Sequence, residues 1–183
     1  MRRLQGDAIA ALGLGPTECS YRVVASGSHW RLRDYGHEHA SNSLLIVAAP
    51  IKRPYIWDLA PSTSVIGFCL DHGLRVRLLE WLPASRHTNS VGLDECAFAI
   101  SECVAQAARE DGGLKPFLSG HSLGGTLAAI YAASASDTIQ GLLLLGAPLS
   151  FQPEQSGFRE ALVALMPPSL PDANPIPARF CRI

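Results

Sequence analysis

Hydrophobic and polar positions follow two different patterns along the chain, and the change comes at about residue 44. Before it, Tyr21–Ser26 and Trp30–Tyr35 are short strand-like runs separated by Gly27 and Ser28, which predicts an antiparallel hairpin. After it, the strand-like runs are mostly continuous in apolar residues, as is typical of strands covered on both faces. The later strands are expected at Leu44–Ala49, Arg75–Trp81, Pro116–Ser119 and Gly141–Leu145.

Segments of helical pattern alternate with these later strands. Ser62 or Ser64 caps a first helix that ends at Leu70, ahead of Gly73. The second helix begins at Asp94 and ends at Gly112 and Gly113, and its apolar residues recur at the spacing of one helix face. A third helix is expected over Leu123–Ala133, and Phe158–Met166 is a fourth candidate before a proline-rich end.

The alternation of strands and helices predicts an α/β fold. Right-handed crossovers place the later strands in a mainly parallel sheet with helices on both faces, beside the N-terminal antiparallel hairpin. The chain divides into an arm or short helix at 1–20, a core at 21–150, and a proline-rich tail or the start of a cap region at 151–183. The sheet is expected to lack the last strands of a complete fold of this kind.

Composition narrows the class of protein. The 183 residues are 48% hydrophobic and 17% charged, with a net charge of −1, so no basic face for nucleic acid is predicted. No apolar run approaches the roughly 20 residues of a membrane span. The five cysteines are an odd number in a chain of ordinary size, which favours reduced thiols and a cytoplasmic protein. No spacing of metal ligands is complete, since the histidines at 37 and 39 lack a third partner, so no metal or cofactor is expected.

The most informative motif is Gly120-His121-Ser122-Leu123-Gly124-Gly125. It has the form Gly-x-Ser-x-Gly and falls between a predicted strand and a predicted helix, which is the context of a nucleophile elbow. A serine at such a turn is lifted clear of the sheet, and only very small residues fit two positions before and after it. The alternative is a glycine-rich turn with an incidental serine. A phosphate-binding loop is excluded because no lysine precedes Thr126.

An acyl-transfer site also needs donors for the negative charge that develops on oxygen. One predicted donor is the backbone N–H of Leu123, directly after the nucleophile. The second is expected in the loop after the strand that ends at Ala49, where Ile51 is the choice by position. The alternative for Ile51 is an ordinary loop at a strand end.

From Leu44 to about Leu149, the sequence resembles the α/β-hydrolases, and within them the poly(3-hydroxyalkanoate) synthases. The stretch Ala49–Leu59, with Lys52, Tyr55, Ile56, Asp58 and Leu59, is similar to the family's loop after its third strand. Gly73–Trp81 is similar to its next strand, which ends in tryptophan, and Gly92–Glu95 to the start of the helix before the elbow. The resemblance implies an acyl-enzyme mechanism on an acyl ester or thioester, such as a hydroxyacyl-CoA or a polyester. A second copy of the chain is a further candidate partner, which would give a homodimer.

Two departures from the family change the expectation. The synthases carry cysteine at the elbow where this chain has Ser122, so hydrolysis is as plausible as polymerisation. All six histidines lie at or before position 121, although the superfamily places its catalytic histidine after the nucleophile. We therefore expect the N-terminal part of a larger enzyme or a truncated product. The alternatives are a protein that keeps the first half of the fold for binding or assembly, and a generic serine esterase.

Overall fold

The computed structural model describes residues 15–36, 40–83, 91–150, 152 and 156–165. Most of the predicted N-terminal arm, the histidines at 37 and 39, and the tail from residue 166 lie outside the described residues, so the proposed division at 1–20 and 151–183 stays a prediction. In the described part of the chain, no helix is long and apolar enough to cross a membrane.

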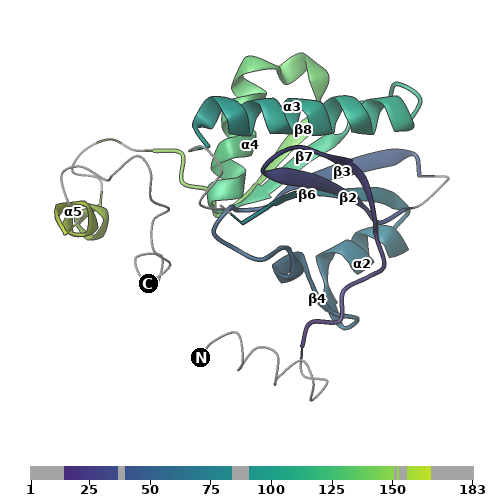
Figure 1. Ribbon diagram of the computed structural model, residues 1–183, viewed down its shortest axis with the longest axis horizontal. Helices are drawn as coiled ribbons and strands as arrows, with labels where there is room; N and C mark the ends of the chain where they lie inside the picture. Colours follow the sequence, from purple (N-terminus) through teal and green to yellow (C-terminus); the bar gives the residue numbers. More distant parts are fainter. Residues whose placement is uncertain (1–14, 37–39, 84–90, 151, 153–155, 166–183) are drawn as a thin grey trace.

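Six strands form one mixed sheet at the centre of the molecule (Figure 1). Their order across the sheet is β1 (Arg22–Ser26), β2 (Trp30–Asp34), β6 (Leu74–Trp81), β3 (Asn42–Val47), β7 (Phe117–His121) and β8 (Gly141–Leu145). β1, β2 and β6 pair antiparallel, whereas β6, β3, β7 and β8 run parallel. Both the predicted hairpin and the predicted parallel sheet are therefore confirmed, each strand lying within about two residues of its expected bounds.

Helices cover both faces of this sheet. α3 (Leu93–Glu110) and α4 (Leu123–Ser134) lie together on one face, and α2 (Val65–Asp71) lies on the other (Figure 1). The Ser64 hydroxyl accepts a hydrogen bond from Gly67 N–H at 2.7 Å, which confirms the predicted cap of α2. Gly73, Gly112 and Gly113 have positive φ angles, as expected of glycines just past helix ends.

Several short elements between β3 and α2 were not predicted, nor was the turn η2 (Ser136–Thr138). A 3₁₀ turn, η1 (Pro54–Trp57), leads into a two-stranded ribbon of β4 (Asp58–Ala60) and β5 (Thr63–Ser64). The elements of this ribbon are too short for hydrophobic periodicity to reveal them. Phe158–Met166 was expected to be helical; the structure places α5 at Gly157–Ala164, and residue 166 lies outside the described part.

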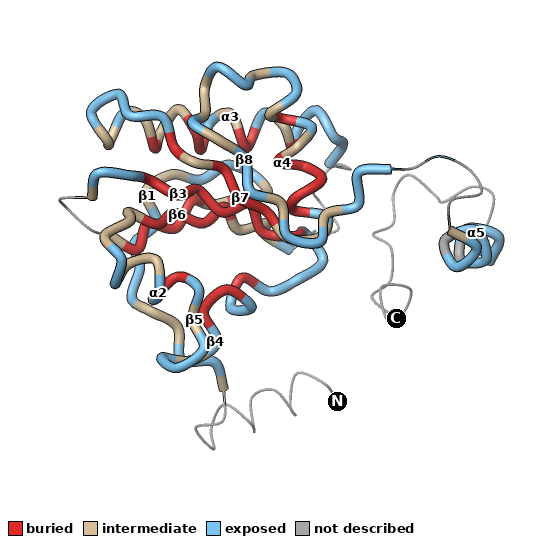
Figure 2. The backbone as a smooth tube through the Cα atoms, turned by 180° about the vertical axis from the view of Figure 1, so that it is seen from behind, coloured by how far each residue is buried: buried red, intermediate tan, exposed pale blue. Residues whose placement is uncertain are grey.

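The core consists of two apolar clusters, one on each face of the sheet, and Figure 2 shows the buried residues concentrated along the central strands and the adjoining parts of the helices. Leu45, Val47 and Leu118 pack against α3 and α4, while Leu44 and Ile46 pack toward Ile66 of α2. Alternate residues of β3 therefore face opposite clusters, which explains its continuous apolar sequence. Trp81, at the end of β6, contacts both clusters.

A buried group of charged residues joins the start of β6 to the end of α3. Arg77, with no exposed surface, donates to Asp111 at 2.7 and 2.8 Å and to Ser43 at 3.0 Å. Arg75 donates to Asp34 at 2.8 Å and to Asp111 at 2.9 Å. Because buried charges require partners, these bonds fix α3 against three strands of the sheet.

β8 lies at one border of the sheet, with no described strand beyond it. Leu142, Leu143 and Leu145 are 37–48% exposed. An apolar edge strand offers unpaired backbone groups to another chain. In Figure 1, α5 stands apart from this edge, so the described part of the tail leaves β8 uncovered.

The buried carboxylate of Asp34 makes folding sensitive to acid. Burial alone would raise its pKa, but hydrogen bonds from Arg75, Gly36 N–H and Arg22 lower it to about 2. A lowered pKa stabilises the fold above the unfolded value near 4, and this stabilisation is lost as pH falls toward 2. We expect the unfolding free energy to drop by about 2 kcal/mol over that range through Asp34. Urea unfolding from pH 2 to 7 should show a weaker acid dependence for Asp34→Asn, with a remainder from Glu80 and Asp111, whose pKa values are also lowered by their arginine partners. Asp71→Asn, at an exposed site, should keep the full dependence.

Gly124 sets how closely α4 approaches β3. A Cβ atom built on Gly124 would lie 2.8 Å from the carbonyl carbon of Ala48, whereas one on Gly157 would meet nothing within 4 Å. Gly124→Ala should therefore lower the unfolding free energy by about 1–3 kcal/mol, although alanine normally stabilises a helix relative to glycine. Gly157→Ala is the matched control and should be neutral or stabilising. Equal thermal denaturation midpoints for both variants would contradict this packing.

The exposed edge of β8 should cause association in solution. We expect sedimentation velocity of the chain to show a concentration-dependent dimer, because β8 can pair with a second copy. Leu143→Lys places a charge on this edge and should shift the equilibrium toward monomer. Leu59→Lys, at a similarly exposed leucine in β4, is the control and should not. A compact monomer at all concentrations would refute the prediction.

Candidate active site

Ser122 lies at a sharp turn where β7 ends and α4 begins. Its backbone has φ 56° and ψ −131°, and among the described residues it is the one non-glycine residue with positive φ. Its N–H donates to Leu145 O at 3.0 Å, and its carbonyl accepts from Gly125 N–H at 2.9 Å and Thr126 N–H at 3.1 Å. These bonds hold a conformation that L-amino acids rarely adopt.

The glycines around Ser122 are required by close backbone contacts. A Cβ on Gly120 would lie 2.6 Å from the carbonyl carbon and oxygen of Gly124, and one on Gly125 would lie 2.6 Å from the Cβ of Ala147. The residues two before and two after Ser122 therefore touch through their backbones. The geometry is that of the tight strand-to-helix turn that the motif predicts.

Ser122 is half-buried, and no described residue forms a hydrogen bond with its hydroxyl. The ring of the neighbouring His121 lies edge-on to Trp57 at a centroid distance of 6.4 Å. The Nδ1 atom of His121 is buried and, within the described residues, has no hydrogen-bond partner. The contact that the structure shows for the His121 ring is therefore local packing against Trp57.

Two backbone N–H groups of the pocket lining, those of Leu123 and Ile51, are not used in hydrogen bonds between described residues. Leu123 is the first residue of α4, where free N–H groups carry the positive end of the helix dipole. Ile51 lies in a turn closed by Lys52 N–H donating to Ala49 O at 2.9 Å. Pro50, between Ala49 and Ile51, has no N–H group and cannot be a donor.

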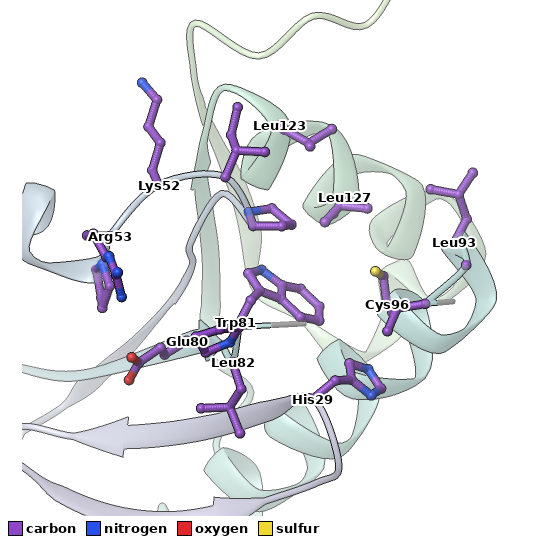
Figure 3. Close-up of a pocket in the computed structure, with 16 residues that line it drawn as sticks. His29, Lys52, Arg53, Glu80, Trp81, Leu82, Leu93, Cys96, Leu123 and Leu127 are labelled. Carbon is purple, nitrogen blue, oxygen red and sulfur yellow. The ribbon is translucent and has the colours of Figure 1, made fainter. Parts of the chain in front are cut away.

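A pocket of about 650 Å³ is lined by both Ile51 and Leu123. In Figure 3, Lys52 and Leu123 lie toward one end of it, His29 and Cys96 lie toward the other, and Trp81 stands between them. The lining is mostly apolar, and its residues come from the β1–β2 turn, the loop after β3, the end of β6 and the starts of α3 and α4. They are His29, Pro50, Ile51, Lys52, Arg53, Pro54, Glu80, Trp81, Leu82, Pro83, Val91, Gly92, Leu93, Cys96, Leu123 and Leu127.

Among the ionisable residues that line the pocket, Glu80 is held by ion pairs, whereas the Nε2 atom of His29 is buried without a hydrogen-bond partner among the described residues. Glu80 pairs with Arg33 at 2.6 Å and also accepts from Arg31, and these bonds lower its pKa against the opposing effect of burial. Burial raises the pKa of the Cys96 thiol, which keeps it protonated and poorly nucleophilic. His29 stacks on Trp81 with nearly parallel rings. Lys52 and Arg53 also line the pocket, and both are exposed, so the positive charges of the lining lie on its solvent side.

The structure brings Ser122, Leu123 and Ile51 to one end of the sheet, and their predicted roles as nucleophile and anion donors stay predictions. Sequence reasoning did not find the pocket walls formed by His29, Trp81 and Cys96, which come from three distant segments. The tryptophan that ends β6 was noticed, but nothing in the sequence indicated its contacts. Among the described residues, no three histidine, cysteine or acidic side chains are grouped so that they could hold a metal ion.

Curated proteins with similar sequences are polymerase subunits. The poly(3-hydroxyalkanoate) polymerase subunit PhaC of Haloferax mediterranei is 37% identical over 109 residues, which are 59% of this chain and 22% of that protein. The chain spans less than a third of the length of the curated relatives that it matches.

Solved structures with the same fold are hydrolases. A CIB-like hydrolase from Thermoplasma acidophilum matches with a TM-score of 0.53 and 11% identity, over 73% of this chain and 64% of that one. A carboxylesterase from Nitrososphaera gargenis matches with a TM-score of 0.52 and 21% identity, over 79% and 53% of the two chains. At these identities, the similarity establishes the fold alone.

A family profile matches residues 86–179, about half of the chain, and carries the description "Serine aminopeptidase, S33". The matched segment contains α3, β7, the turn at Ser122, α4 and β8. The strand order, the turn after β7 and this match all indicate the same family: the chain belongs to the α/β-hydrolase family.

Proposed function

We propose that the chain carries the nucleophile and oxyanion site of an enzyme that transfers the acyl group of carboxylic esters or thioesters through Ser122. The strained backbone of Ser122 is the observation that carries this proposal. A positive φ at a non-glycine residue costs about 1–3 kcal/mol and persists where surrounding contacts impose it, often at functional sites. Here Ser122 lies between the end of β7 and the start of α4, and the residue after it, Leu123, lines the pocket.

The surroundings of Ser122 support acyl transfer in particular. When a serine oxygen adds to a carbonyl carbon, the carbonyl oxygen becomes an anion that needs hydrogen-bond donors. The free N–H groups of Leu123 and Ile51 supply such donors on two sides. The adjoining pocket, within the 300–1,000 Å³ range of ligand sites, has apolar walls that suit an acyl chain. The acyl-enzyme is then resolved by water or by a second alcohol.

A polyester substrate is the narrower form of the proposal. The relation to PhaC subunits, at 37% identity over 109 residues, favours hydroxyacyl thioesters or polyesters. Serine at the position of the synthases' cysteine favours hydrolysis, because serine is the usual nucleophile of esterases and lipases. The alternative is a protein that uses this fold for binding or assembly without catalysis. The labelling experiment below decides between a catalytic and a non-catalytic function.

No histidine follows position 122 in these 183 residues, although the superfamily places the base for its nucleophile there. Ser122 should therefore react slowly with a fluorophosphonate, and added imidazole should accelerate the reaction at least about tenfold by acting as the base. In this reaction the Oγ–phosphorus bond forms, fluoride leaves, and imidazole takes the hydroxyl proton. Intact-protein mass spectrometry gives the rate, and peptide mapping gives the site.

Ser122→Ala should abolish the labelling, whereas Ser119→Ala, three residues earlier in the chain and within β7, should retain it. Rapid labelling without imidazole would show that the chain holds its own base. Absence of labelling at every imidazole concentration would refute the nucleophile and leave a binding protein as the better interpretation. Preference for hydroxybutyryl over simple butyryl thioesters in competition with the probe would support the polyester form.

A further inference from the structure

Trp81, the last residue of β6, makes a hydrogen bond to the strand beside it. Its indole Nε1–H donates to the carbonyl oxygen of Ala48 at 2.6 Å. Ala48 is the first residue after β3, and its own N–H donates to Leu79 O at 3.2 Å. Both polar groups of Ala48 are therefore held by β6, one by its backbone and one by a side chain.

The Ala48 carbonyl also lies against the start of α4. A Cβ built on Gly124 would lie 3.0 Å from the Ala48 oxygen and 2.8 Å from its carbonyl carbon. The carbonyl is thus confined between the indole of Trp81 and the backbone of Gly124. Gly124 follows Leu123, whose free N–H is one of the two proposed oxyanion donors.

Ala48 leads directly into the turn that holds the other donor. The turn at residues 49–52 is closed by its own Lys52–Ala49 hydrogen bond. Ile51 in this turn is 59% exposed, so little packing restrains it from outside. The direction of the Ile51 N–H therefore depends on how Ala48 enters the turn.

We propose that Trp81 is a positioning residue of the oxyanion site. Its indole N–H fixes the Ala48 carbonyl, and through it the turn at 49–52, so that the N–H groups of Ile51 and Leu123 converge on one oxygen. This inference rests on the proposed function. It gives Trp81 a second role besides lining the pocket, where its ring stacks on His29.

The chain contains a matched control for the hydrogen bond. The Nε1 atom of Trp57 is buried and has no partner among the described residues. Trp57→Phe therefore removes an N–H that makes no bond, whereas Trp81→Phe removes one that bonds Ala48. A second variant replaces Trp81 by benzothienylalanine, which keeps the bicyclic shape and has sulfur in place of the N–H group.

The experiment measures two quantities on each variant. Amide ¹H–¹⁵N spectra report the environment of Ile51, and imidazole-supported fluorophosphonate labelling of Ser122 gives a maximal rate and a half-saturating probe concentration. Both Trp81 variants should shift the Ile51 amide signal and lower the maximal rate about tenfold, less than the loss of a whole oxyanion donor. In the benzothienylalanine variant the half-saturating concentration should stay unchanged, because the apolar wall remains. Trp57→Phe should leave the Ile51 signal and the rate as they are.

The outcomes separate this inference from the proposed function. If Ser122 is labelled normally and the benzothienylalanine variant changes neither the Ile51 signal nor the maximal rate, the role of Trp81 is overturned and the proposed function stands. If the unaltered chain is not labelled at any imidazole concentration, both are overturned. A slower rate with an unmoved Ile51 signal would also refute the positioning role, since Trp81 would then act by another route.

Discussion

The backbone contact between the end of β7 and the start of α4 is the constraint on which the candidate site depends. Gly120, Gly124 and Gly125 let the two elements touch without side chains. This contact forces Ser122 into its left-handed conformation and brings α4 down onto β3. The free helix N–H groups and the loop after β3 come to the same place as a consequence. The backbone conformation of Ser122, the position of the α4 N-terminus and the pocket wall at Leu123 therefore follow from one steric condition.

The opposite end of the sheet is held by charge. Arg75 and Arg77 of β6 bind Asp34, Glu110 and Asp111, which come from β2 and from the end of α3. The ionic network therefore lies where β3 and β6 begin, and the close contact of Gly124 with Val47 and Ala48 lies where β3 ends. At the end of the sheet that carries the pocket, the ion pairs found among the described residues are those of Glu80, so the pocket lining is mostly apolar. α3 is fixed at its last turn, while its first turn lines the pocket.

The sequence was sufficient for the sheet, the main helices and the turn at Ser122. Long elements with buried faces leave a strong periodic signal, and Gly-x-Ser-x-Gly reports a steric requirement directly. The ribbon of β4 and β5 was missed because such short strands carry too few positions for a period. The ionic network was missed because Arg75 and Arg77 read as solvent-facing residues of a strand, and only the fold shows which acids meet them. The pocket could not be predicted because His29, Trp81 and Cys96 come together only through the strand order.

The two borders of the sheet differ in their chemistry. β1, at one border, carries Arg22, whose exposed guanidinium is paired with Asp34 of the neighbouring strand. β8, at the other border, is glycine and leucine throughout and has no charged group of its own. If two copies paired through β8, that border would be used in both of them, so the pair would close with two-fold symmetry and would not extend through the same contact into a filament.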